Sequence, residues 1–183
     1  VNSTTGTTRA VKVSSGGSGS AHHIKFSNFH IGNYVEDGVV LGDDTFSVKL
    51  NGGAIASCQG WGVKAEMASN STLTVSDVDF YIVGSSAGTG AILCDTARMI
   101  KISDCRFDNI NGAGSAAMKF DGAHGMVNAS DCTIRVCDTD LINLIDSGDL
   151  TQSNNMSQAT TNNMCGMSIK NTNIINSKLL DWY

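Results

Sequence analysis

The stretch Leu73-Thr74-Val75-Ser76-Asp77-Val78-Asp79-Phe80 decides the fold, because the same eight-residue pattern returns along the chain. It lines up with residues 100–107 and again with residues 127–134, both times at an offset of 27 residues (100 − 73 and 127 − 100). Three more copies begin at Ile24, Val48 and Met167, at offsets of 24, 25 and 40. Six copies of one pattern predict a repeat architecture.

Each copy reads as a strand with a bend in its middle. Apolar residues occupy the first and third positions, two small or polar residues follow, and apolar residues resume at the sixth and eighth positions. This one-residue slip would turn the second half of a straight strand outward, whereas a bend at the polar pair keeps both halves facing one interior. The bend falls on residue types that tolerate left-handed backbone: Asn28, Gly52, Asp77, Asp104, Asp131 and Asn171.

A second series of short apolar runs lies between the copies, at residues 38–41, 91–94, 116–120 and 141–145. Each repeat therefore predicts about three short strands joined at corners, and stacked repeats form parallel ladders. Right-handed winding follows from the crossover rule. A meandering β-sandwich is the alternative, although it requires neither a fixed period nor a constant corner residue.

We therefore expect an all-β fold, a right-handed single-stranded parallel β-helix of about six coils with 25–27 residues each. The domain covers residues 24–178, with residues 1–23 as a lead-in or partial coil. Residues 179–183 form its C-terminal end or the start of a further segment.

Composition excludes several classes of partner. The 183 residues include no Pro and only 16% charged residues, and the net charge is −5. This balance argues against a broad nucleic-acid surface, and no apolar run is long enough for membrane insertion. The four histidines fit no zinc spacing and there is no C-x-x-C pair, so we expect no metal site and no cofactor.

Cys105 and Cys132 occupy the same position in consecutive copies. Stacked strands would bring their Cα atoms within disulfide range. The two residues form either a disulfide or a stack of buried thiols, and we favour the thiols.

Candidate catalytic residues are Asp95, Asp121 and Asp146, which follow the second series of strands at offsets of 26 and 25. They predict an outward column of carboxylates, and paired carboxylates are what glycoside cleavage requires. Asp is also a common turn residue, which gives these three positions a purely structural alternative.

Candidate substrate-binding residues come from two places. A polar insertion at about residues 151–163 contains Asn154 and Asn155, whose amides suit sugar hydroxyls, although a spacer loop explains it equally well. Trp61, between two glycines, and Tyr81 are candidate aromatic platforms for a sugar. Trp61 has a core or subunit-contact role as its alternative.

The coil pattern and polar corners over residues 24–175 resemble the pectin-lyase-like right-handed parallel β-helix family. The Gly/Ser/Asn-rich composition without Pro is most similar to the β-helix domains of bacteriophage tailspikes and tail fibres. The resemblance implies a homotrimer in the virion tail appendage that binds, and often cleaves, a bacterial surface glycan.

Our first functional expectation is therefore a polysaccharide-binding module for host recognition. The alternatives are a polysaccharide depolymerase, either hydrolase or lyase, and an extracellular segment of a bacterial cell-surface adhesin.

Overall fold

The computed structural model describes residues 9–14, 19–32, 36–110, 112–121, 124–137, 140–145, 167–170, 173–175 and 181–182. These residues form strands, turns and bends, and none of them is helical. The strands are β1 (Arg9–Val13), β2 (Ile24–Gly32), β3 (Asp37–Leu41), β4 (Ser47–Ala56), β5 (Val63–Glu66), β6 (Thr72–Tyr81), β7 (Gly90–Ser103), β8 (Arg106–Ile110), β9 (Ala116–Asp121), β10 (His124–Ser130), β11 (Thr133–Cys137), β12 (Asp140–Ile145), β13 (Met167–Lys170), β14 (Asn173–Ile175) and β15 (Asp181–Trp182).

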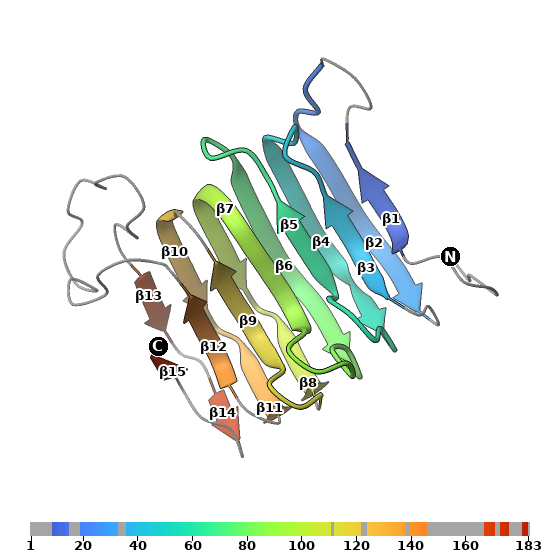
Figure 1. Ribbon diagram of the computed structural model, residues 1–183, viewed down its shortest axis with the longest axis vertical. Coiled ribbons are helices and arrows are strands. Elements are labelled where there is room, and N and C mark those ends of the chain that lie inside the picture. Colours follow the sequence, from blue (N-terminus) through green and yellow to red (C-terminus); the bar gives the residue numbers. More distant parts are fainter. Residues whose placement is uncertain are drawn as a thin grey trace.

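The strands wind into a parallel β-solenoid of about four turns (Figure 1). Every strand pairing in the described part of the chain is parallel. This arrangement excludes the β-sandwich, whose sheets are antiparallel. The right-handed winding, the count of six coils and the trimer stay predictions.

Two sides of the solenoid can be distinguished. The front sheet, nearest the viewer in Figure 1, pairs β1, β3, β5, the first part of β7, β9 and β12 in that order. The bent sheet behind it contains β2, β4, β6, the second part of β7 with β8, β10 with β11, and β13 with β14. The strands β1 and β5 were not among the runs picked out from the sequence.

The register confirms the predicted repeat residue by residue. One ladder of the bent sheet joins the first positions of all six copies: Ile24, Val48, Leu73, Ile100, Val127 and Met167. The 27-residue offset is thus the length of chain that returns a strand to the same place one turn later.

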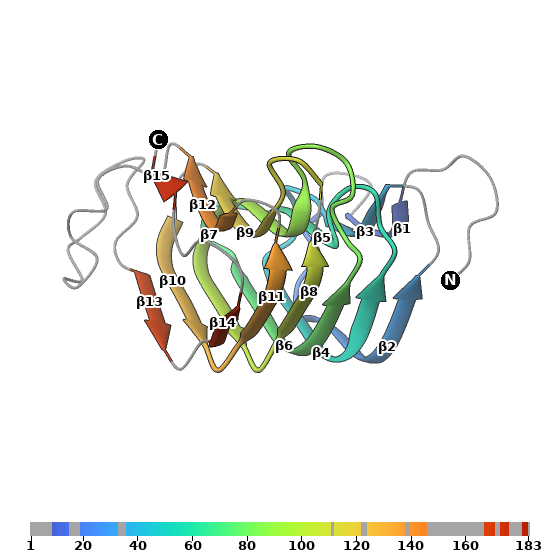
Figure 2. The ribbon, with the colours of Figure 1, turned by 90° about the horizontal axis from the view of Figure 1, so that it is seen from below.

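A left-handed residue bends each turn of the bent sheet and divides it into a first arm and a second arm. Figure 2 shows this bend as the V between β10 and β11. The φ angles are positive at all five described corner positions: Asn28 (51°), Gly52 (65°), Asp77 (55°), Asp104 (56°) and Asp131 (56°). The predicted corner column is confirmed there, while Asn171 lies outside the described residues.

The bend turns both arms toward one apolar interior. Leu73 and Val75 before the corner and Phe80 after it are fully buried. The rings of Phe80 and Phe107 stack on successive turns with centroids 5.1 Å apart. Gly53 leaves room for its neighbour, because a Cβ there would lie 2.5 Å from the Phe29 carbonyl oxygen and 2.9 Å from its ring.

We expect the corner conformation to make a measurable contribution to stability. Replacing Asp104 with Val places a β-branched residue in the left-handed region and should lower the free energy of unfolding by about 1–2 kcal/mol. Asp104→Gly, which has no Cβ to strain, should cost clearly less. Denaturant unfolding of the two variants measures the difference, and an equal loss in both would contradict the argument.

Candidate functional site

The second arm of the bent sheet carries a hollow on its outer surface. Its volume is about 300 Å³, and it is lined by His30, Ala54, Ala56, Asp79, Phe80, Tyr81, Arg106 and Asp108. Most of these residues belong to two outward columns of the ladder. One column joins His30, Ala54, Asp79 and Arg106, and the other joins Gly32, Ala56, Tyr81 and Asp108.

The hollow exists because the side chains change size from one turn to the next. The β4 turn contributes only the methyl groups of Ala54 and Ala56, whereas the next turn contributes Asp79 and Tyr81. On the other side, the His30 ring covers Gly32, since a Cβ there would lie 3.3 Å from His30 Nε2. Large side chains on both sides of a small-residue turn leave a groove.

Tyr81 supplies an aromatic surface to this groove. It is 49% exposed and is the one large hydrophobic side chain exposed among the described residues. Its expected role as an aromatic platform therefore has the exposure that it requires. A ring with an apolar face and a polar tip suits a ligand that presents both C–H and O–H groups.

The charged groups of the groove hold one another in place. Arg106 Nη2 donates to Asp108 Oδ2 at 2.6 Å, and Arg135 Nη1 lies 3.7 Å from the same oxygen. The hydrogen bond to Asp108 raises the pKa of Arg106, and Asp79 adds a smaller electrostatic contribution in the same direction. The groove therefore presents both donors and acceptors around Tyr81.

Sequence reasoning found Tyr81 but missed His30, Asp79, Arg106 and Asp108. The available signal was the repeat itself, because these residues occupy the seventh and ninth positions counted from the start of each copy. Those positions point outward once the chain bends at the corner. Without the bend, the same residues read as isolated polar residues in a strand.

Trp61 requires a correction, because its ring is only 6% exposed. The flanking glycines prevent steric overlap and do not expose the ring. A Cβ on Gly60 would lie 2.5 Å from Asp37 Oδ1, and one on Gly62 would lie 2.8 Å from the Ala91 carbonyl oxygen. The alternative of a core residue describes Trp61 better than an exposed sugar platform does.

The predicted carboxylate column does not form as a regular ladder. Asp95 lies at an irregularity, where Ala65 pairs with Cys94 but Glu66 pairs with Thr96. The ladder partner of Asp121 is Ile145, the residue before Asp146. Asp146 lies outside the described residues, as do Asn154 and Asn155 of the polar insertion.

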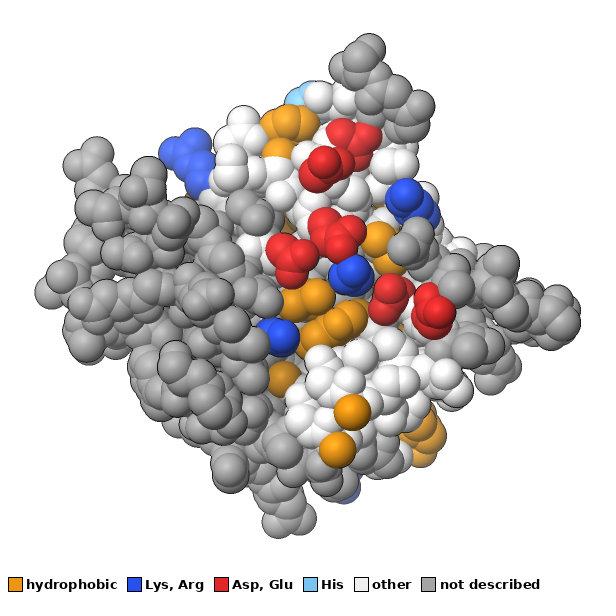
Figure 3. Space-filling model, viewed as in Figure 1, with side chains coloured by type: hydrophobic (Ala, Val, Ile, Leu, Met, Phe, Trp, Pro, Cys, Tyr) orange, Lys and Arg blue, Asp and Glu red, His pale blue; other side chains and the backbone are white. Residues whose placement is uncertain are grey.

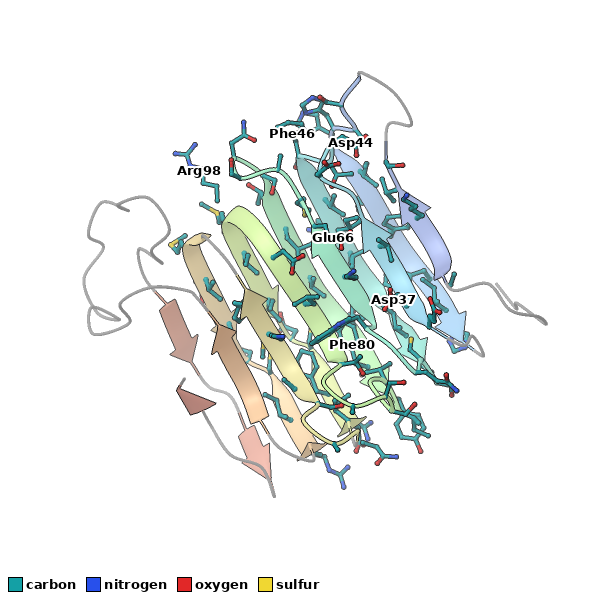
Figure 4. The ribbon with its side chains drawn as sticks, viewed as in Figure 1. Asp37, Asp44, Phe46, Glu66, Phe80 and Arg98 are labelled. Atoms are coloured by element: carbon teal, nitrogen blue, oxygen red, sulfur yellow. The ribbon has the colours of Figure 1, made fainter. Side chains whose placement is uncertain are left out.

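The outer face of the front sheet balances its acidic groups around Lys64. Lys64 Nζ lies 2.6 Å from Glu66 Oε1, and this hydrogen bond raises the pKa of Lys64, with smaller contributions from Asp37 and Asp95. Figure 3 looks onto this face and shows acidic and basic side chains among apolar ones, and Figure 4 places Glu66 and Asp37 on its strands. Asp37 also accepts a hydrogen bond of 2.8 Å from the Trp61 backbone N–H.

No group of three metal-ligating side chains occurs within the described ranges. The same part of the chain contains no helix long and apolar enough to cross a membrane. No protein-family model, no curated protein and no solved structure matches the chain. The groove must therefore be interpreted from its own residues.

Cys105 and Cys132 are free thiols stacked on successive turns, and both are buried. Each sulfur lies 3.2 Å from a backbone carbonyl oxygen, that of Ser103 for Cys105 and that of Ser130 for Cys132. The hydrogen bond with Cys132 and burial both raise the pKa of Cys105. The structure thus agrees with the thiol alternative favoured above.

We expect both thiols to resist alkylation in the folded protein, because a reagent cannot reach side chains that are 1–2% exposed. Site-resolved mass spectrometry after iodoacetamide treatment at pH 8 should find both sites unmodified under native conditions. The same treatment in denaturant should modify both. Rapid native alkylation of either residue would contradict the buried stack.

Proposed function

We propose that this protein is a polysaccharide-binding β-solenoid module and that the Tyr81 groove is its sugar-binding surface. The observation that carries the proposal is the exposed Tyr81 ring beside a hollow of about 300 Å³ lined by carboxylates, a guanidinium and an imidazole. Binding sites combine an apolar surface with a few fixed polar groups in this way.

The chemistry of the groove matches that of a sugar. The Tyr81 ring packs against a face of C–H groups, while Asp79 and Asp108 accept hydrogen bonds from hydroxyls and Arg106 donates them. The Arg106–Asp108 ion pair holds two of these groups in position before a ligand arrives. This preorganisation lowers the entropy that binding would otherwise cost.

The biological setting that we propose is a bacteriophage tail fibre or tailspike, in which the module is a homotrimer that adsorbs to bacterial surface polysaccharide. The support is the resemblance described from the sequence, together with a parallel solenoid whose rigid ladders hold the groove at a fixed place. Sedimentation should give the mass of three chains. A mass near one subunit would instead favour the adhesin segment.

Binding to a panel of immobilised O-antigen and capsular polysaccharides tests the groove. We expect Tyr81→Ala to weaken binding of the recognised glycan about tenfold or more, because the stacking surface is lost. Tyr81→Phe keeps the ring and should retain most of the affinity. Ala54→Leu should also weaken binding, because it fills the hollow without removing a polar group.

Two outcomes would contradict the groove as a binding surface. One is the absence of binding across the panel, and the other is binding that neither Tyr81→Ala nor Ala54→Leu affects. Circular dichroism and thermal unfolding of each variant establish that the solenoid is intact, which is expected because Tyr81 is half exposed.

A depolymerase is the second candidate, because Asp79 and Asp108 line the same groove. Glycoside hydrolysis uses two carboxyl groups, one to protonate the leaving oxygen and one to act as base or nucleophile. If the groove cleaves its ligand, new reducing ends should accumulate, and Asp79→Asn should abolish their release while binding persists. Binding without any product would reject this candidate.

A further inference from the structure

The first arm of the bent sheet has an outer surface unlike that of the second arm. Its outward columns contain three lysines and seven neutral polar residues over five turns, and no acidic or aromatic residue. One column joins Lys25, Lys49, Thr74, Lys101 and Asn128, and the other joins Ser27, Asn51, Ser76, Ser103 and Ser130. We call this surface the lysine face.

The three lysines are exposed, and none has an ion-pair or hydrogen-bond partner within the described part of the chain. Lys25 and Lys49 are direct partners on neighbouring strands, so their ammonium groups repel each other. Lys101 follows two strands further, which makes the row about 14 Å long at the spacing of a β-ladder. Lys64 on the front sheet differs, because Glu66 neutralises it.

We infer that the lysine face binds a linear acidic polysaccharide laid along the solenoid axis. An anionic chain would relieve the repulsion between Lys25 and Lys49 and reach Lys101. The neighbouring column would then hydrogen-bond the hydroxyls of the sugar, and in that column Ser76 Oγ already donates to Asn51 Oδ1 at 2.8 Å. The inference rests on the proposed function for the class of ligand and adds that this glycan is acidic.

The surroundings of the lysine face favour a glycan over a nucleic acid. The corner next to the face carries Asp77, Asp104 and Asp131, all exposed, and the whole chain has a net charge of −5. Closely spaced phosphates would be repelled by these carboxylates, whereas a sparsely charged chain would follow the lysines. The face also lacks the aromatic or arginine platforms on which single-stranded bases stack.

Titration of the protein with alginate, a polymer of carboxylate sugars, tests the inference, with uncharged dextran as the reference polymer. The variant Lys25→Gln/Lys49→Gln should bind alginate about tenfold more weakly or worse, and its affinity should depend less on salt concentration. Lys25→Arg/Lys49→Arg keeps the charges and should retain binding. The matched control Lys12→Gln/Lys64→Gln changes the net charge equally on the front sheet and should leave the affinity unchanged.

Three results would overturn the inference: an unchanged alginate affinity after the Lys25/Lys49 substitution, an equal loss in the front-sheet control, or tighter binding of a single-stranded oligodeoxynucleotide than of alginate. Tyr81→Ala separates this inference from the proposed function. Loss of alginate binding in the lysine variant alone supports the lysine face whatever the groove does. Loss in Tyr81→Ala alone leaves the groove standing and rejects the lysine face.

Discussion

The left-handed bend of each turn is the constraint on which the rest of the structure depends. A strand alternates its side chains between two faces, so a one-residue slip in the apolar pattern would expose half of the buried residues. Positive φ at the corner reverses that consequence, and both arms then bury their apolar side chains in one interior. Because each turn bends at the same ladder position, neighbouring turns stay in register and their backbone hydrogen bonds form without interruption.

This stacking also determines how surface sites are built. Each turn contributes one residue to each outward column, so a site consists of residues that lie about one repeat apart in the sequence. A groove appears where one turn contributes alanines and its neighbours contribute large side chains. A charged row appears where several turns contribute the same residue type, as Lys25, Lys49 and Lys101 do.

The faces of the solenoid differ in how their charges are compensated. Lys64 and Arg106 both have carboxylate partners at 2.6 Å, and these ion pairs hold side chains in fixed positions. Exposed pairs of this kind contribute little to stability, typically below about 1 kcal/mol. Their role here is to orient groups on the surface. The lysine face has no such partners, and it is the surface whose charge remains available to a ligand.

The sequence by itself determined the repeat, the position of its corner and the parallel ladders, because apolar periodicity and residues that accept positive φ are local properties of the chain. It also singled out Tyr81. It misjudged Trp61, since the glycines beside it answer to Asp37 and Ala91, which other strands bring into contact. Asp95 and Asp121 do not continue a regular column with Asp146, because a bulge and a pairing with Ile145 change the register. Only the tertiary structure decided which outward residues share a face, since that depends on the bend and on the turn above and below, neither of which a single strand contains.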